Sequence, residues 1–402
     1  MKILIVNISD LNGGAARASY RLHNALLGED IDSEMLVQHK VSDDYTVLTE
    51  ISKIRKTLNV LRSLIETIPM KIVKQKRKDF FSPSWFGFSN VVDKINKINP
   101  DIVHLHWIND GMIKIEDLVK IKAPIVWSLH DMWAFTGGYH YDDESRDYLH
   151  EGSLLEKWVF KRKKRTFSKI NNMTIIGLSH WLYESAKESF LLKNKKHVSL
   201  PNPIDIDKFK LIDKRVAQAL FGLPNDKKLI LFGAMNAGSD PRKGFSKFSM
   251  ALKYLNDEKI ELVVFGMSEP QESEELGFIT HYMGNINDDV ALIALYNSVN
   301  VVVVPSLQEN LSNVVMESLA CGVPVVAFDI GGNSDMIEHQ QNGYLAKPLD
   351  SVDLANGIEW VIHNENYEEL SKNARKKVVN YFDSKVVAKK YIELYKGILC
   401  EQ

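Results

Sequence analysis

Two glutamates, Glu309 and Glu317, stand eight positions apart in a stretch that predicts a strand, a polar loop and a helix in succession. Glu309 follows the apolar run Val301–Val304, and Glu317 lies about one turn into an apolar-periodic segment at residues 311–320. Such a layout directs backbone N–H groups and the positive end of a helix at whatever binds in the loop. A phosphate would be stabilised there, and a carboxylate beside it could bind sugar hydroxyls.

Taken singly, Glu309 is typical of a solvated loop residue and Glu317 of an exposed helix residue. The surrounding string is more specific, because Pro305-Ser306 ends the strand and Ala320-Cys-Gly-Val-Pro follows the second glutamate. It resembles the Glu-x7-Glu signature of the retaining glycosyltransferases of family 4, which have the GT-B fold. The resemblance implies that Glu317 binds the ribose of a nucleoside-diphosphate sugar and Glu309 the transferred sugar. Further donor contacts are expected at Asn310, Leu311, Ser312 and Asn313.

The composition is that of an ordinary folded protein. The 402 residues suffice for two or three domains, and 45% are hydrophobic and 25% charged. A net charge of −2 argues against general nucleic-acid binding. Two cysteines, Cys321 and Cys400, provide neither a disulfide framework nor a metal cluster, so a reducing compartment is expected. Cys321 is predicted to be a small buried residue.

The subcellular location that we expect follows from two predicted absences, that of a signal peptide and that of a membrane-spanning segment. The apolar start, Met1 to Ile8, is too short for a signal peptide and reads as a first buried strand. No stretch approaches the ~18 apolar residues that span a bilayer. We therefore expect a cytoplasmic protein with at most a peripheral contact on the inner face of the plasma membrane.

Short apolar runs alternate with helical patterns along the whole chain, which predicts parallel sheets with right-handed crossovers. The number of strands favours two doubly wound sheets over one. The expected strands are Lys2–Val6, Ser33–Val37, Ile102–Leu105, Ile125–Leu129, Thr174–Leu178, Lys196–Leu200, Lys228–Phe232, Glu261–Phe265, Ile279–Tyr282, Val299–Val304 and Val323–Phe328. Expected helices include Ala15–Leu27, Phe88–Ile98, Trp181–Ser189, Asp289–Asn297, Leu311–Ala320 and Val386–Leu399.

The domain switch is predicted near residues 201–215, because Pro201 and Pro203 stiffen the chain and cannot continue a helix. The GT-B resemblance implies two doubly wound, parallel-sheet, Rossmann-like α/β domains that face a central cleft. The first, residues 1–203, would bind the acceptor. The second, residues 204–384, would bind the nucleotide-sugar donor. A C-terminal helix at residues 385–402 would cross back to the first domain.

The first predicted β-strand is followed by Asn12-Gly13-Gly14-Ala15, which is not the dinucleotide pattern G-x-G-x-x-G. Two glycines let the backbone approach a ligand closely at a helix N-terminus, although a simple tight turn would have the same sequence. The stretch resembles the Gly-Gly-Ala loop of family 4, which implies that Gly13 and Gly14 lie near the acceptor and the donor phosphate.

A second string, residues 128–140, places His130 and Asp131 at the end of a strand and before an aromatic, glycine-rich loop. Open α/β folds bind ligands at this edge of the sheet, and a histidine there can donate to a sugar hydroxyl. The pair could also merely order the loop. The string resembles the His-Asp-x-Trp-x-x-Thr-Gly-Gly loop of one branch of the family. That resemblance implies acceptor contacts from His130, Asp131, Trp133, Thr136 and Gly137, while His104 and His106 shape the sheet edge.

Arg242 and Lys243 follow the first strand of the second half, and a point charge beside a planar fork suits a diphosphate. Without context they could equally be a solvated basic turn. Lys243-Gly244 matches the donor-phosphate lysine of family 4. The arginine that the family usually has after the glycine of that strand is replaced by Ala234, and Arg242 is a candidate substitute.

Two basic segments carry apolar residues between the charges. Lys53–Lys78 has nine Lys and Arg against one Glu, and Lys161–Arg165 lies beside Trp158. Such segments suit an anionic membrane surface and, in the half expected to bind the acceptor, a lipid-linked acceptor. A solvated basic helix is the alternative. Asp30-Ile-Asp32 and Asp205-Ile-Asp207 fit Asp-x-Asp but stand where no metal site is expected.

Together these features indicate a retaining, metal-independent glycosyltransferase in which His130, Glu309 and Lys243 carry the catalysis. It would need no cofactor and would transfer a hexose from a UDP- or GDP-sugar to a glycan or lipid-linked glycan in bacterial lipopolysaccharide, O-antigen or capsule synthesis. Two alternatives stay open: a related nucleotide-sugar epimerase or sugar phosphorylase, and a non-catalytic nucleotide- or glycan-binding member of a polysaccharide assembly.

Overall fold

The computed structural model describes residues 1–49, 61–62, 64–73, 79–86, 90–143, 146–233, 240–267, 276–286 and 288–401. The chain forms two compact units. Unit 1 comprises Met1–Pro203 together with Val387–Gln402, and unit 2 comprises Ile204–Val386. None of the described helices has the length and hydropathy needed to cross a membrane.

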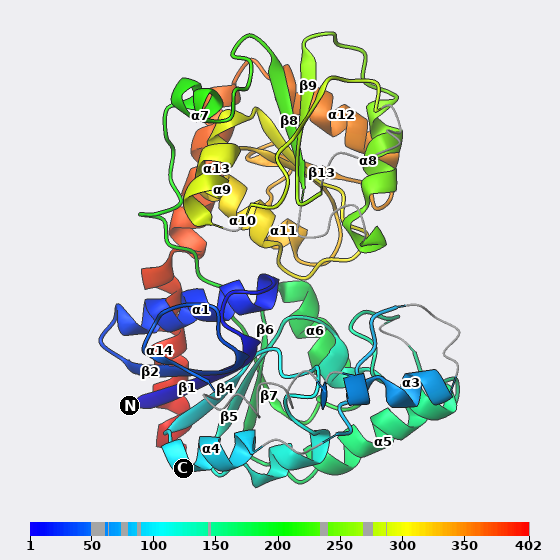
Figure 1. The fold of residues 1–402 in the computed structure, drawn as a ribbon, viewed down its shortest axis with the longest axis vertical. Coiled ribbons are helices and arrows are strands. Elements are labelled where there is room, and N and C mark those ends of the chain that lie inside the picture. Colours follow the sequence, from blue (N-terminus) through cyan, green and yellow to red (C-terminus); the bar gives the residue numbers. More distant parts are fainter. Residues whose placement is uncertain are drawn as a thin grey trace. The chain divides into compact units, whose positions relative to one another are not determined.

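Unit 1 is built on a parallel sheet with the strand order β3-β2-β1-β4-β5-β6-β7 in its described part (Figure 1). Because β1 and β4 are neighbours while β2 and β3 lie beyond β1, the chain changes direction across the sheet between β1 and β4. The strands are β1 (Lys2–Ser9), β2 (Asp32–His39), β3 (Val47–Leu48), β4 (Ile102–Leu105), β5 (Ile125–Leu129), β6 (Met173–Gly177) and β7 (Lys196–Ser199).

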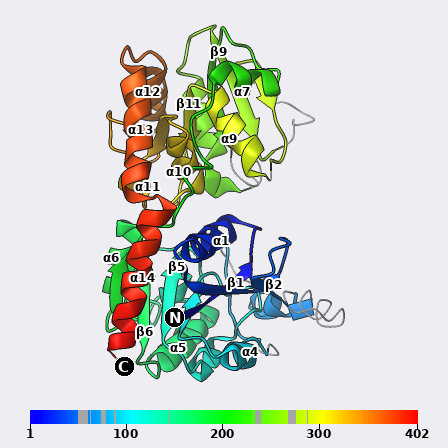
Figure 2. The same cartoon turned by 90° about the vertical axis from the view of Figure 1, so that its left-hand side faces the viewer.

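Helices cover both faces of this sheet, so its inner strands are apolar on both sides. In β1, Ile3 and Ile5 face a core shared with α1 (Gly14–Leu27) and α14 (Ser384–Cys400), which Figure 2 shows in front. Leu4 and Val6 face the opposite core. That core is shared with α4 (Val91–Ile98), α5 (Leu154–Phe167) and α6 (His180–Glu188), while α3 (Ile68–Ile72), η1 (Ile115–Lys120) and η2 (Trp133–Phe135) connect the elements of this unit.

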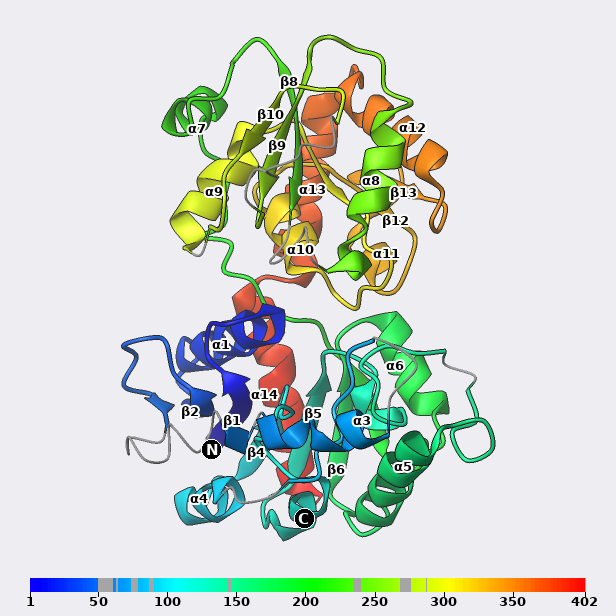
Figure 3. The same ribbon diagram turned by 45° about the vertical axis from the view of Figure 1, so that its right-hand side comes forward.

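Unit 2 repeats the plan with the strand order β10-β9-β8-β11-β12-β13, again all parallel in its described part (Figure 3). The strands are β8 (Lys228–Gly233), β9 (Ile260–Phe265), β10 (Thr280–Tyr282), β11 (Val301–Val304), β12 (Val325–Phe328) and β13 (Gly343–Ala346). One face packs against α9 (Asp289–Ser298), α10 (Asn313–Ala320) and α13 (Tyr367–Tyr381), and the other against α8 (Phe245–Leu252) and α12 (Ser351–Ile362). Shorter elements are α7 (Lys214–Leu220), η3 (Pro241–Lys243) and α11 (Asn333–Met336).

The strands predicted from sequence are all present. β4 and β5 have the predicted bounds, and the ends of the others differ by at most three residues. The helix expected from Leu311 begins instead at Asn313, because the Ser312 hydroxyl caps it by accepting the Val315 N–H. The short strands β3 and β13 were not predicted, since β3 has only two residues and β13 begins with a glycine, a residue type depleted in strands.

The end of the chain is fixed to unit 1 by a buried polar contact. The Tyr395 hydroxyl of α14 lies 2.7 Å from Nδ1 of His104 in β4, and the other ring nitrogen of His104 lies 2.8 Å from the Ser128 hydroxyl of β5. Both His104 and Tyr395 are fully buried. Burial lowers the pKa of His104 to about 3, so the ring is neutral at pH 7.

The Tyr395→Phe variant should therefore be less stable than the wild type. Removing the hydroxyl leaves a buried ring nitrogen of His104 without its partner, which costs about 1–3 kcal/mol. Tyr45→Phe is the matched control, because Tyr45 is 89% exposed. Chemical denaturation followed by circular dichroism measures both. Equal stabilities of the two variants would show that the contact with His104 does not hold α14.

Candidate functional site

The carboxyl ends of β8 and β11 meet where the strand order of unit 2 changes direction, the position at which doubly wound sheets bind ligands. The loops that follow these strands touch each other. Gly244 adopts a left-handed conformation with φ of +73°, and a Cβ on it would overlap the carbonyl group of Pro305. The Leu307 N–H donates to the Arg242 carbonyl over 2.7 Å. A glycine at position 244 is thus required for the two loops to lie this close.

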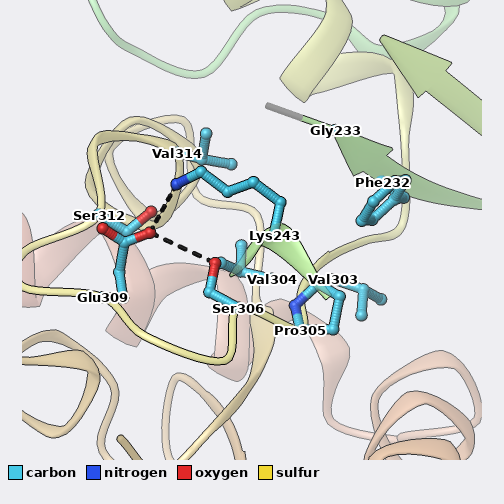
Figure 4. Close-up of a pocket in the computed structure, with 10 residues that line it drawn as sticks. All are labelled: Phe232, Gly233, Lys243, Val303, Val304, Pro305, Ser306, Glu309, Ser312 and Val314. Atoms are coloured by element: carbon cyan, nitrogen blue, oxygen red, sulfur yellow. Dashed lines mark hydrogen bonds and ion pairs between the residues drawn. The ribbon is translucent and has the colours of Figure 1, made fainter. Parts of the chain in front are cut away.

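This contact brings Lys243 and Glu309 together. Lys243 Nζ lies 2.9 Å from Glu309 Oε2, and the same oxygen accepts from the Ser306 hydroxyl at 3.3 Å (Figure 4). Their side chains are 27% and 13% exposed, so the pair is partly open to solvent. The two groups line a pocket with the ends of β8 and β11, to which Ser312 and Val314 also contribute. The pocket thus combines one cation, one carboxylate and the start of α10.

Arg242 is directed differently from Lys243. Its guanidinium group binds the Asp240 carboxylate, with Nε 3.1 Å from Oδ1 and Nη2 2.8 Å from Oδ2. Burial raises the pKa of Asp240, but the hydrogen bond and the charge of Arg242 outweigh burial and hold that pKa below its usual value. Arg242 therefore already has a carboxylate partner. Ala234, the position of the usual family arginine, lies outside the described residues.

Glu317 is buried, at 3% exposure, and accepts a hydrogen bond of 2.8 Å from the Tyr296 hydroxyl of α9. It is not among the residues that line the pocket of Figure 4. Its contact with ribose stays a prediction. Tyr296 was not predicted from sequence, although a tyrosine inside the apolar pattern of Asp289–Ser298 signals a buried hydroxyl that needs a polar partner.

The other predicted donor residues of unit 2 shape the loop before α10. Asn310 is buried and its carbonyl accepts the Gly332 N–H at 2.8 Å. Leu311 packs in the core, and Ser312 caps α10 while lining the pocket. Asn313 begins the helix and is half-buried.

In unit 1 the corresponding switch point lies between β1 and β4, and polar side chains hold the loops there. Asn7 of β1 accepts the Trp107 N–H at 2.8 Å and donates to the Ser9 carbonyl at 2.6 Å. Gly13 has φ of +100° and precedes α1, and nothing lies within 4 Å of where its Cβ would be. Gly14, the first residue of α1, is exposed.

His130, directly after β5, is partly exposed and contacts a second histidine. Its Nε2 lies 2.9 Å from Nδ1 of His106, so one ring donates and the other accepts. Burial lowers the pKa of His130 to about 4 and holds that of His106 well below its usual value, so both are neutral at pH 7. His130 can therefore accept or donate a hydrogen bond but brings no positive charge.

Asp131 has both of its oxygens committed. Oδ2 accepts from Trp107 Nε1 at 3.0 Å and from His140 Nδ1 at 2.6 Å, and Oδ1 accepts the Trp133 N–H at 2.9 Å. Burial raises the pKa of Asp131, but His140 and these hydrogen bonds outweigh burial and hold it below its usual value. The other nitrogen of His140 lies 2.8 Å from the Ser82 hydroxyl. Asp131 thus orders the loop around His130.

The remaining predicted acceptor residues are buried in unit 1. The Thr136 hydroxyl donates to the Tyr139 carbonyl at 2.5 Å, and a Cβ on Gly137 would overlap the ring of Tyr148. The fully buried Lys163 of α5 donates to the carbonyls of Trp133 and Thr136 and lies over the Trp133 ring at 3.8 Å. Burial lowers the pKa of Lys163 well below its usual value. Trp133, Thr136 and Gly137 therefore support the loop from inside, and a direct acceptor contact by them stays a prediction.

Only some side chains of the basic cluster Lys161–Arg165 are exposed. Lys163 is inside, and Arg162 binds Glu116 with Nε 2.6 Å from Oε1, so Lys161, Lys164 and Arg165 alone of the five are exposed. Only three of the five cations can therefore take part in the predicted membrane contact, because two positions of a helix that packs on a sheet face inward. Most of Lys53–Lys78, with all but Arg62 and Lys71 of its basic residues, lies outside the described residues.

Known families cover both units. Residues 12–208 match the family described as Glycosyltransferase Family 4, and residues 214–377 match Glycosyl transferases group 1. The chain belongs to the GT-B glycosyltransferases of family 4. In this family 4 glycosyltransferase, the pair Lys243–Glu309 lies inside the region that matches Glycosyl transferases group 1, and His130 lies inside the region that matches Glycosyltransferase Family 4.

Relatives of this glycosyltransferase act in glycan synthesis. It is 27% identical over 244 residues to the capsular polysaccharide biosynthesis glycosyltransferase CapM of Staphylococcus aureus, which covers 56% of this chain and 62% of that protein. It is 23% identical over 317 residues to the UDP-Gal:alpha-D-GlcNAc-diphosphoundecaprenol alpha-1,3-galactosyltransferase of Escherichia coli, covering 75% and 76%. The structure of sucrose-phosphate synthase from Thermosynechococcus elongatus superimposes with a TM-score of 0.73 over all of both chains at 19% identity, which shows a shared fold.

Proposed function

We propose that this glycosyltransferase moves a hexose from a nucleoside-diphosphate sugar, with UDP or GDP as the nucleotide, with retention of configuration and without a metal. The observation that carries the proposal is the pair Lys243–Glu309 at the switch point of unit 2, 2.9 Å apart in a partly open pocket. A cation beside a carboxylate suits a donor that is anionic at its diphosphate and rich in hydroxyls at its sugar.

In the proposed reaction, Lys243 and the N–H groups at the start of α10 hold the diphosphate, and Glu309 binds the transferred sugar. The bond from the anomeric carbon to the diphosphate oxygen breaks, and the transition state resembles an oxocarbenium ion paired with the departing diphosphate. The acceptor hydroxyl attacks on the same face and gives its proton to the leaving diphosphate. Catalysis then consists of stabilising charge on the diphosphate and orienting the acceptor.

We place the acceptor on unit 1, with His130 as the group that contacts its hydroxyl, since His130 is neutral and partly exposed. The acceptor we propose is a lipid-linked glycan of bacterial surface polysaccharide, such as lipopolysaccharide, O-antigen or capsule. This choice is supported by the printed activities of the relatives, which include capsular polysaccharide synthesis and transfer to a diphosphoundecaprenol-linked sugar.

Lys243→Gln and Glu309→Gln should each lower kcat by about 100-fold or more, because each removes a charge that acts on the transition state. Their thermal unfolding should stay close to wild type, since a partly exposed pair contributes about 1 kcal/mol or less. Turnover with radiolabelled sugar nucleotide measures the effect.

The matched control is Lys247→Gln. Lys247 lies one turn further along, and its Nζ binds the Leu349 carbonyl at 2.9 Å instead of the pocket. Lys247→Gln should keep the wild-type turnover. Wild-type turnover in Lys243→Gln and Glu309→Gln would remove the pair from the mechanism.

A screen of UDP, GDP, ADP and CMP in buffer with EDTA tests the donor and the absence of a metal. At 100 times its Kd, the correct nucleotide should raise the unfolding free energy by about 2.7 kcal/mol. UDP is the first expectation. The stabilisation should disappear in Lys243→Gln and persist in Lys247→Gln. A shift that requires added Mg²⁺ or Mn²⁺ would contradict metal independence.

We also propose a peripheral contact with the inner face of the plasma membrane through α5. Leu154, Trp158, Lys161 and Arg165 follow one another at intervals of four, three and four residues and so share one face of the helix. Leu154 is 82% exposed and Trp158 40% exposed. Exposed apolar groups next to cations suit the boundary between anionic headgroups and lipid chains.

Vesicle co-sedimentation tests this surface with the variant Lys161→Gln/Lys164→Gln/Arg165→Gln. Binding to vesicles of phosphatidylglycerol and phosphatidylcholine should weaken by about 100-fold, at roughly 1 kcal/mol per cation. The control Lys372→Gln/Lys376→Gln/Lys389→Gln removes three exposed charges elsewhere and should bind like the wild type. Equal binding of both variants would rule α5 out as the membrane contact.

A further inference from the structure

Unit 2 contains a second cavity, of about 330 Å³, lined by residues of α7, the turn before β8 and the start of β8. Lys228 of its lining is the first residue of β8, whereas Gly233 at the other end of that strand lines the pocket of Lys243 and Glu309. The two sites therefore lie at opposite ends of β8, and the cavity is separate from the candidate donor site.

The lining of this cavity is strongly basic. It contains Lys214, Arg215, Lys227 and Lys228 and one carboxylate, Asp226. The surrounding unit has the opposite sign, because residues 204–386 hold 17 Lys and Arg against 26 Asp and Glu, a net charge of −9. Four cations around one cavity are thus a local concentration that the composition of unit 2 does not explain.

Three of these cations have no counter-ion within the part of the chain that the structure describes. Lys227 is engaged, with Nζ 3.1 Å from the Glu258 carbonyl and 3.8 Å from Glu261. Among the described residues, Lys214, Arg215 and Lys228 form no ion pair within 4 Å, and neither does Asp226. The nearby Asp213 is used as the cap of α7, where it accepts the Val216 N–H at 3.0 Å.

The placement of Lys214 beside Lys228 is unfavourable without a ligand. Lys214 is half-buried, and burial together with the neighbouring ammonium of Lys228 lowers its pKa to about 8. At neutral pH the folded protein thus holds two like charges close together in a partly dehydrated cavity. An anion between them would remove this repulsion and supply the missing hydrogen-bond acceptors.

We propose that this cavity is a binding site for a phosphate-bearing anion, held by Lys214, Arg215 and Lys228. Two ammonium groups and a guanidinium fork suit the several oxygens of a phosphate or diphosphate better than a single carboxylate. The proposed site is separate from the candidate donor site, because the cavity shares no lining residue with the pocket of Lys243 and Glu309.

Calorimetric titration with inorganic pyrophosphate in metal-free buffer tests the proposal. The titration uses Lys243→Gln protein, in which the donor site is weakened, so that binding reports on the cavity. Adding Lys214→Gln/Lys228→Gln should weaken binding by about tenfold or more, since charge-assisted hydrogen bonds are lost. Adding Lys253→Gln/Lys372→Gln, which removes two exposed charges elsewhere in unit 2, should leave the affinity unchanged.

Thermal unfolding shows that the variants fold. Without ligand, Lys214→Gln/Lys228→Gln should melt at or above the temperature of its parent, because the repulsion is gone, and added pyrophosphate should no longer raise its Tm. Three results would overturn the proposal: no pyrophosphate binding by Lys243→Gln protein, equal affinity with and without the cavity substitutions, or the same loss in the Lys253→Gln/Lys372→Gln control.

Discussion

The candidate donor site depends on one backbone contact, the close approach of Gly244 to the carbonyl of Pro305. The loops after β8 and β11 come from strands that are neighbours in space but about 70 positions apart in sequence, and this contact fixes their distance. Lys243, the residue before Gly244, therefore lies beside the segment that carries Glu309. A side chain at position 244 would need both a strained φ and room that Pro305 occupies, so the charge pair follows from the absence of a Cβ.

Much of this arrangement is readable from sequence, because alternating apolar runs and helical patterns define strands buried on both faces. The sequence also predicts that Lys243 and Glu309 serve one site, since each stands in the loop that follows a strand and doubly wound sheets bind ligands at such loops. The strand order and the contact between the two side chains came only from the structure. What sequence could not show is which polar groups already have partners. Arg242 is as close to the pocket in sequence as Lys243, yet Asp240 two positions earlier captures its guanidinium group.

The same limit applies to burial. Glu317 and Lys163 look like surface residues of amphipathic helices, but each lies inside its unit with a specific polar partner. Charge type predicts a solvated face, and only tertiary packing reveals the exceptions. In unit 1, buried polar groups hold the loop after β5 in place, since Asp131 accepts hydrogen bonds from Trp107, Trp133 and His140. In unit 2, the pair Lys243–Glu309 stays partly exposed, at 27% and 13%.

Lys163 joins α5 to the loop after β5. Nζ of Lys163 donates to the carbonyls of Trp133 and Thr136, so the conformation of the loop after β5 depends partly on α5, nearly thirty positions later in the chain. Grafting residues 130–140 from this enzyme into another protein would transfer the amino-acid sequence of the loop without its conformation. An exchange of this loop must therefore move the loop and α5 together.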